Sequence, residues 1–330
     1  MSARIVLFAL AVSLTSALVV PSKANEKRSS YPFNQIVAFG DELSDNGNGS
    51  YAHGITGNPA NVYSFGTWTD GPVAVSYLAD MLGVPLVDYA FGGCCGGGTF
   101  GAVLDNTYTS GAAQVNGAPV PSLHDQIRSN YTQQPNNNIK NSLQFIWIGE
   151  NDVSMHTDAF WQGDPKNADF AKQYSSRVTA EAEYLVSQGA PYVFVANIYP
   201  KHLAPVTKTY LCPDGSCVST WGAIIQQAND ALEQSLAASP SASKFIYYDA
   251  NAYITALLNT KDYWGLSAPA NVFCDGGEGN EWDTCISGSY VWQGATKFFW
   301  MNYIQPTTTV HHMIAVNMKE RINEFFAGHY

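Results

Sequence analysis

Five short runs of apolar residues recur along the chain, and longer segments with apolar positions at helical spacing separate them. The runs are rich in β-branched or aromatic side chains, which is typical of strands buried on both faces. They cover residues 35–39, 84–89, 143–148, 192–198 and 244–248. The segments with helical spacing cover residues 73–82, 170–188, 222–238 and 308–326.

The alternation of strands and helices predicts a parallel sheet with helices on both faces. No internal repeat or linker is visible, so the simplest organisation is a single domain over residues 29–330. Residues 96–121 and 200–217 are expected to form long loops. Ligand sites in open α/β sheets lie at the carboxyl ends of the strands, so the residues just after the apolar runs are the candidates for chemistry.

The first 24 residues have the pattern of a signal peptide. Arg4 supplies the positive end, residues 5–20 are largely apolar, and small residues precede position 25. Lys27-Arg28 offers a second, dibasic processing site. The apolar stretch is short for a membrane span, and no later segment has 18 consecutive apolar residues. We therefore expect a secreted, extracellular protein without a membrane partner.

Six cysteines fall into local pairs, namely Cys94 and Cys95, Cys212 and Cys217, and Cys274 and Cys285. Export favours disulfides, and we expect the second and third pairs to close short loops. The first pair could be a vicinal disulfide or two thiols. No His or Cys cluster at ligand spacing accompanies it, so we expect neither a metal nor another cofactor. Sequons at Asn48 and Asn130 predict a glycoprotein, although Asn48 lies in a motif that could be too enclosed.

Composition narrows the class of partner. Hydrophobic residues make up 46% of the 330 residues, enough for a sizeable core, while charged residues make up 13%. The formal net charge of −11 repels phosphate backbones, so we expect no nucleic acid partner. We expect a monomer whose partner is a polysaccharide or oligosaccharide, for reasons that follow from the motifs.

Polar motifs follow the predicted strands. The segment FGDELSDNGN at residues 39–48 follows the first run, DYAFGG at 88–93 ends the second, and GEND at 149–152 follows the third. NYIQPT at 302–307 precedes the last predicted helix. Together these motifs resemble the four blocks of the SGNH (GDSL-type) hydrolase family. The first, third and last family blocks read Gly-Asp-Ser-x-Ser-Asp-x-Gly, Gly-x-Asn-Asp and Asp-x-x-His-Pro-Thr.

The resemblance implies a flavodoxin-like three-layer α/β/α domain with a five-stranded parallel sheet. It also implies an oxyanion hole formed by Gly93 and Asn151. Residues 46–50, 67–75 and 306–311 look most like fungal acetylesterases that act on plant polysaccharides.

The departures from the family pattern fall on the catalytic triad. Glu42 stands at the nucleophile position, Asn302 at the aspartate position and Gln305 at the histidine position. Placing Met301 at the aspartate position instead still leaves no Asp-x-x-His. A serine esterase needs a hydroxyl beside a base, and an amide cannot take the proton.

Two carboxylates are the candidate catalytic groups. Pairs of carboxyls with separated pKa values carry out glycoside hydrolysis, and Glu42 with Glu150 would form such a pair. Donors from Gly93 and Asn151 would hold Glu42 ionised, as base or nucleophile, and Glu150 would be the proton donor. The alternatives are that Glu42 is the relic of a lost enzyme and that Glu150 is a solvated loop acid.

Four other residues are candidate binding groups. Asn302 and Gln305 offer amides that suit sugar hydroxyls, and His202, after the fourth run, offers an imidazole base at the rim. Trp68 is a candidate sugar-stacking platform. We expect structural roles for the remaining polar residues of the motifs and a packing or surface role for two late histidines. These are Asp41, Ser44, Asp45, Asp152, His311 and His312.

The leading hypothesis is therefore a secreted carbohydrate-active hydrolase, glycosidase-like, acting on a plant or fungal cell-wall polysaccharide or oligosaccharide through Glu42. One alternative is a non-catalytic carbohydrate-binding pseudoenzyme. The other is a GDSL-type acetylesterase or lipase with a relocated nucleophile.

Overall fold

The computed structural model describes residues 31–49, 66–93, 101–109, 114–115, 118–156, 167–274, 285–287, 290–291 and 293–328. The signal peptide and the Cys94-Cys95 pair lie outside these residues. Five strands form one sheet in the order β2-β1-β5-β6-β7, and every neighbouring pair is parallel. They are β1 (Gln35–Gly40), β2 (Leu86–Asp88), β5 (Ser142–Trp147), β6 (Tyr192–Ala196) and β7 (Phe245–Tyr248). The predicted α/β fold with a five-stranded parallel sheet is confirmed.

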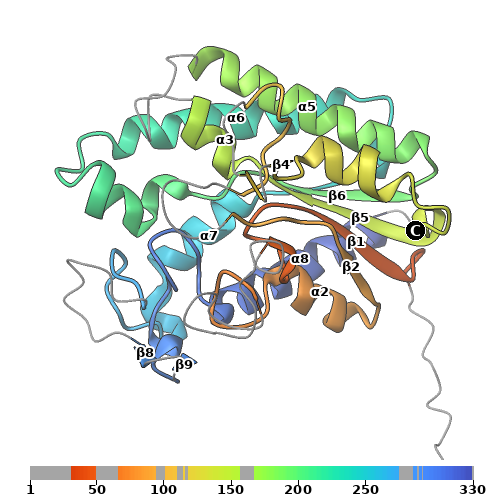
Figure 1. Cartoon of the computed structure of the whole chain (residues 1–330). Helices are drawn as coiled ribbons and strands as arrows, with labels where there is room; N and C mark the ends of the chain where they lie inside the picture. The colour runs from red at the N-terminus through yellow and green to blue at the C-terminus, as the bar shows by residue number, and fades with distance from the viewer. Residues whose placement is uncertain are drawn as a thin grey trace, which may run out of the picture.

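Helices cover both faces of the sheet (Figure 1). One face carries α5 (Asn167–Ser187) and α6 (Val218–Ala238), and the other carries α2 (Ala74–Leu82), α7 (Ala250–Asn259) and α8 (Thr308–Ala327). Strand β5 contributes apolar side chains to both faces of the sheet. Phe145 and Trp147 pack into the core under α2 and α8, whereas Ile146 packs into the core under α5 and α6.

Two helices were not predicted from the sequence. Helix α3 (Glu150–His156) begins directly after β5, inside the third motif, and α7 follows β7. Asp249 caps α7 by accepting a hydrogen bond from the backbone of Ala252. Two short hairpins join β3 (Gln114–Val115) to β4 (Ala118–Pro119) and β8 (Ile286–Ser287) to β9 (Tyr290–Val291). Short π and 3-10 segments complete the described elements: Asp125–Tyr131, Ile139–Asn141, Lys201–Leu203, Thr207–Leu211, Ala242–Lys244, Lys261–Trp264 and Gln293–Lys297.

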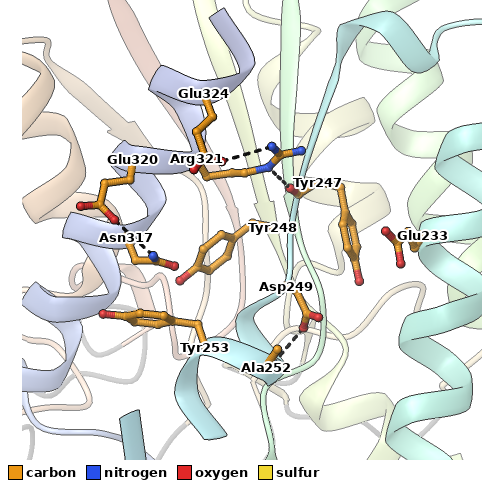
Figure 2. Close-up of a pocket in the computed structure, with 10 residues that line it drawn as sticks. All are labelled: Glu233, Tyr247, Tyr248, Asp249, Ala252, Tyr253, Asn317, Glu320, Arg321 and Glu324. Carbon is orange, nitrogen blue, oxygen red and sulfur yellow. Dashed lines mark hydrogen bonds and ion pairs between the residues drawn. The ribbon is translucent and has the colours of Figure 1, made fainter. Parts of the chain in front are cut away.

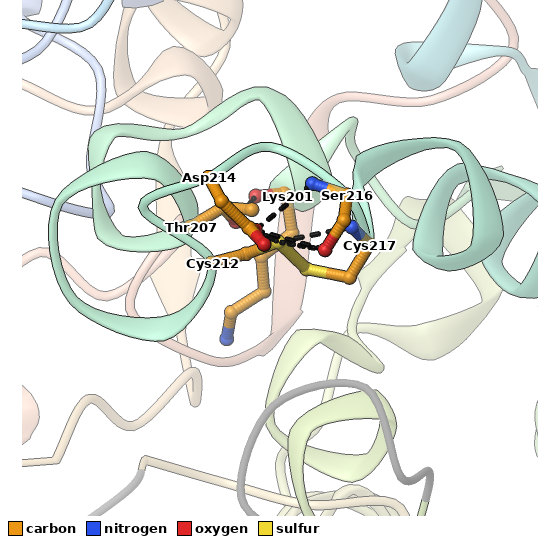
Figure 3. The surroundings of a disulfide bond; sticks show 6 residues. All are labelled: Lys201, Thr207, Cys212, Asp214, Ser216 and Cys217. Atoms are coloured by element: carbon orange, nitrogen blue, oxygen red, sulfur yellow. Dashed lines mark hydrogen bonds between the residues drawn. A yellow bond between two sulfur atoms is a disulfide. The ribbon is translucent and has the colours of Figure 1, made fainter.

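The structure pairs Cys212 with Cys217 and Cys274 with Cys285 as disulfides. Figure 3 shows the first of these in the loop before α6, where the Asp214 carboxylate accepts hydrogen bonds from the backbone and hydroxyl of Ser216. The preceding turn is tied to Lys201, because the Thr207 hydroxyl donates to the Lys201 carbonyl at 3.1 Å. The disulfide loop therefore adjoins the segment that carries Lys201, a residue of the candidate site.

The surroundings of Asn48 bear on glycosylation. Its side-chain nitrogen donates to the carbonyls of Asp88 at 2.9 Å and Ala90 at 3.0 Å. A glycan on this nitrogen would break both contacts, so Asn130 is the better acceptor. In the part of the chain that the structure describes, no helix has the length and apolar character needed to cross a membrane.

Candidate functional site

The turn after β1 is held together by its own aspartates. The Asp45 carboxylate accepts hydrogen bonds from the backbone N–H groups of Gly47, Asn48 and Gly49, and also from Gly92 at 2.7 Å. The last of these contacts joins the first motif to the second. Asp45 thus has the structural role that the sequence predicted, and it fixes the position of Gly93 relative to Glu42.

Three donors converge on the Glu42 carboxylate. Oε1 accepts from the backbone N–H of Gly93 at 3.3 Å and of Gly101 at 2.6 Å, and Oε2 accepts from Nδ2 of Asn151 at 2.9 Å. Gly93 and Asn151 are the two groups expected to form the oxyanion hole. The carboxylate of Glu42 therefore occupies the hole itself. A Cβ atom at Gly101 would come within 2.5 Å of the Glu42 carboxyl carbon, so only glycine allows this approach.

Glu150 is buried at the start of α3, with 2% of its surface exposed. Oε2 lies 3.4 Å from Nζ of Lys201, and Oε1 accepts a hydrogen bond from Nε2 of Gln305 at 3.3 Å. Lys201 also donates to the Glu150 carbonyl at 3.1 Å. Glu150 is thus not a solvated loop acid. In the described structure its side chain contacts the Lys201 ammonium and the Gln305 amide.

Lys201 is the functional residue that sequence reasoning missed. It follows the fourth predicted strand, at the sheet edge where chemistry is expected, and a buried lysine there needs an anionic partner. The sequence favours its neighbour His202 instead, as a candidate imidazole base at the rim of the site. The His202 ring packs against Gly222 of α6, and burial lowers its pKa to about 4. Within the described residues no contact joins His202 to Glu42 or Glu150.

Three carboxylates meet at this point, because one oxygen from each of Asp41, Glu42 and Glu150 lies within 4.8 Å of the others. Burial, and next the charge of Glu150, raises the pKa of Glu42 to about 7 although Asn151 and Gly93 donate to it. Burial and the two glutamates also raise the pKa of Asp41 well above its ordinary value. The expectation that the donors keep Glu42 firmly ionised is wrong, because desolvation outweighs them.

The same cluster is what could hold a metal ion. Hard divalent cations prefer carboxylate oxygens, and among the described residues this is the one set of side chains close enough to share an ion. The Lys201 ammonium already lies against Glu150 and supplies positive charge there. The described structure places this ammonium beside a group of three carboxyls, two of which have raised pKa values.

The side-chain amides of Asn302 and Gln305 in the last motif form hydrogen bonds within the protein. Oδ1 of Asn302 accepts from the backbone of Ile304 at 2.8 Å and of Gln305 at 2.7 Å, and Nδ2 donates to the Trp68 carbonyl at 3.2 Å. Asn302 and Gln305 are 7% and 4% exposed. Neither is placed to bind a sugar hydroxyl as the sequence suggested.

Trp68 is half-buried and lies against the second motif. A Cβ atom at Gly92 would clash with its indole ring, so the ring sits directly on the backbone beside the Gly93 donor. Trp68 thus lies beside the second motif, while the buried Tyr199 hydroxyl lies at the carboxylate cluster itself, against Glu150.

Two buried groups outside the cluster are structural, as expected. Asp152 accepts from the backbone of Leu104 and from the Thr109 hydroxyl, and burial raises its pKa to about 7. Nδ1 of His311 accepts from the backbone of Ala74 in the first turn of α2, and burial lowers the His311 pKa to about 3.

Comparison with known proteins identifies the family of the chain. The family model described as GDSL-like lipase/acylhydrolase matches residues 36–310. Lipase 1 of Photorhabdus luminescens is 25% identical over 194 residues, which cover 57% of this chain and 26% of the lipase. The chain thus spans about a quarter of that relative. A solved gut microbial diltiazem-metabolizing enzyme aligns at 10% identity and a TM-score of 0.43, over 88% of this chain and 46% of that one.

Proposed function

Because the chain belongs to the GDSL-like lipase/acylhydrolase family, we propose that it is a secreted member that binds carbohydrate and has lost serine ester hydrolysis. The observation that carries this proposal is the position of Glu42. Its carboxylate takes the hydrogen bonds of Gly93, Gly101 and Asn151 that would otherwise be available to a substrate oxygen.

An acylhydrolase uses such donors to stabilise the negative oxygen that forms on the substrate. Here the carboxyl oxygens of Glu42 already lie there, so the carbonyl oxygen of an ester is excluded. If the Glu42 carboxylate attacked the ester, it would form a mixed anhydride and expel the alcohol, and hydrolysis of that anhydride would also need a base to activate water. The residue at the histidine position is Gln305, an amide that donates to Glu150. Both halves of the acyl-transfer cycle are thus missing.

The motifs that resemble fungal carbohydrate acetylesterases support carbohydrate as the ligand. Trp68 beside the Gly93 donor supports it further, since aromatic faces stack on sugar rings. Tyr303, 44% exposed within the last motif, offers a second aromatic face. The signal-peptide pattern and the two disulfides support secretion.

A second candidate function is hydrolysis with Glu42 as a general acid or base. The raised pKa of Glu42, about 7, favours it, because acid-base groups work best near the ambient pH. Glycosidases place both carboxyls against the scissile bond, whereas Glu150 is buried and held by Lys201 and Gln305. A hydrolase of this kind would need a different second group, so binding is the better-supported function.

The test combines turnover and binding on one protein sample. We expect no turnover of p-nitrophenyl acetate or acetylated xylan, and saturable binding to a member of a panel of plant and fungal wall polysaccharides. Trp68→Ala should weaken that binding, and Asp80→Asn, an exposed acid on α2, is the matched surface control. Ester turnover that a serine-directed phosphonate blocks would refute the proposal. Polysaccharide turnover that disappears in Glu42→Gln would establish the second candidate instead.

A further inference from the structure

A cleft of about 390 Å³ lies at the edge of the sheet formed by β7, two strands from the end of β5 where Glu150 begins α3. Its volume is in the range of small-ligand pockets. Residues from β7, α6, α7 and α8 line it, and Figure 2 shows them around the strand edge. None of the carboxylate-cluster residues contributes to it. The family motifs likewise lie elsewhere.

The charges around the cleft are predominantly negative. Four carboxylates line it, from Glu233, Asp249, Glu320 and Glu324, against the single guanidinium of Arg321. Arg321 is occupied, because its Nε donates to the Tyr247 carbonyl at 2.9 Å and its Nη1 lies 3.5 Å from Glu324. Among the described residues no ion pair involves the other three carboxylates. The cleft therefore attracts a cation.

One wall of the cleft is aromatic and carries a buried hydroxyl without a partner. Tyr248 and Tyr253 lie with ring centroids 6.5 Å apart, and Figure 2 shows them together on the side of Asn317 and Glu320. Tyr248 is 3% exposed, and its hydroxyl makes no hydrogen bond. A ligand that donates an N–H would satisfy this oxygen, and tyrosine faces attract cations.

The spacing of the carboxylates decides between a metal ion and an organic cation. Within the described structure, the only carboxylates close enough to share one ion are Asp41, Glu42 and Glu150. Those of the cleft are spread around its rim. A ligand with several N–H donors on an extended frame fits this distribution better than a point charge does.

We propose that this cleft binds a small organic ligand through a protonated amine, held between the Glu320 carboxylate, the Tyr248 hydroxyl and the two tyrosine rings. Such an amine could belong to a free polyamine or to an amino sugar of a polysaccharide. The site is independent of Glu42, so it stands or falls separately from the function proposed above.

The proposal is tested by isothermal titration calorimetry of the full chain with three probes: spermidine, a glucosamine tetramer and the neutral N-acetylglucosamine tetramer. We expect saturable binding of at least one amine that the cleft variants weaken, whereas any binding of the neutral sugar should be the same in those variants. A stronger response to spermidine identifies the polyamine source, and a stronger response to the glucosamine tetramer identifies the amino sugar. Raising NaCl from about 50 to about 300 mM should weaken binding, because exposed charges are screened.

Two variants locate the site. Tyr248→Phe removes only the hydroxyl, and we expect roughly tenfold weaker binding of the amine because a hydrogen bond to a charged group is lost. Glu320→Gln keeps the shape and removes one charge, with an expected loss of roughly three- to tenfold. Asp80→Asn, which removes the same charge on α2, should bind the amine as the unaltered protein does. Unchanged affinity for the amines in both cleft variants, or an equal loss of affinity for the neutral sugar in them, would overturn the proposal.

Discussion

Replacing Glu42 by glutamine should flatten the dependence of stability on pH. Burial and the charge of Glu150 raise the pKa of Glu42 from 4.5 to about 7 in the folded protein. The folded state therefore binds the proton more tightly than the unfolded state. The free energy of unfolding then falls as pH rises from about 4.5 to about 7, and Glu42→Gln removes this contribution.

The size of the effect follows from the difference in pKa. At roughly 1.4 kcal/mol for each pKa unit, the upper limit is about 3 kcal/mol between the two pH extremes. Glu42 keeps some exposure to solvent, and its titration is linked to that of Asp41 and Glu150. We therefore expect about 1–2 kcal/mol of pH-dependent difference between the variant and the unaltered protein.

The measurement is urea unfolding followed by tryptophan fluorescence at several pH values from about 5 to about 8. The readout is the slope and not the absolute stability, since an amide facing the Asn151 and glycine donors also has a cost that does not depend on pH. Buried His202 and His311 have lowered pKa values and act in the opposite direction, so only the difference between variant and unaltered protein is diagnostic. Glu324→Gln, an exposed acid on α8, is the control. A Glu42→Gln slope equal to that of the unaltered protein would show that this carboxyl is not desolvated.

Three further predictions concern the ion pair, the triad and the disulfides. Lys201→Met should lower the free energy of unfolding by about 3–5 kcal/mol because it leaves the buried Glu150 carboxyl without its ion-pair partner. The double variant Lys201→Met/Glu150→Gln should recover much of this loss. In the same urea assay Lys261→Met, which leaves only the solvent-exposed Asp262 carboxylate without its ion pair, should lower the free energy of unfolding by about 1 kcal/mol or less. Equal losses for the two lysines would contradict this. Glu42→Ser alone should not hydrolyse p-nitrophenyl acetate, and Glu42→Ser/Asn302→Asp/Gln305→His should exceed every single variant, since triad residues act as a unit. Activity of the single variant equal to the triple would reveal another base. Replacing Cys212 and Cys217 by serine should lower the free energy of unfolding by about 2–4 kcal/mol. Peptide mapping without reduction should find the pairs Cys212–Cys217 and Cys274–Cys285, and another partner for Cys212 would reject the assignment.

The sheet could be predicted because its strands are buried on both faces. Every residue of β5 is buried, and all but Ser142 and Gln144 are apolar, so the strand lacks the polar face that a surface helix would show. Helix α3 is not predicted from the sequence because its first residues, Glu150 to Asp152, belong to the polar third motif. Helix α7 does carry a start signal, the Asp249 cap, but this signal directly follows a strand and is easily assigned to the loop.

The site was predictable where it rests on sequence motifs and not where it rests on packing. Glu42, Gly93 and Asn151 come from three separate motifs, and the structure brings them together as expected. The ion pair of Lys201 with Glu150 joins residues far apart in sequence, and no local pattern marks it. The pKa of Glu42 could not be predicted either. Sequence identifies the donors, but the desolvation that outweighs them depends on how closely the chain encloses the carboxyl.

The residues at positions 42 and 305, in the first and last motifs, are best explained together. A carboxyl group at position 42 lies beside those of Asp41 and Glu150. Fixed donors from Gly93, Gly101 and Asn151 form hydrogen bonds with Glu42. Glu150 is held separately by the Lys201 ammonium and the Gln305 amide. A histidine at position 305 would bring a proton that can move, whereas an amide brings donors that cannot. The proposed loss of ester hydrolysis fits this arrangement, because the Gln305 amide cannot accept a proton and the Glu42 carboxyl takes the donors that an ester oxygen would need.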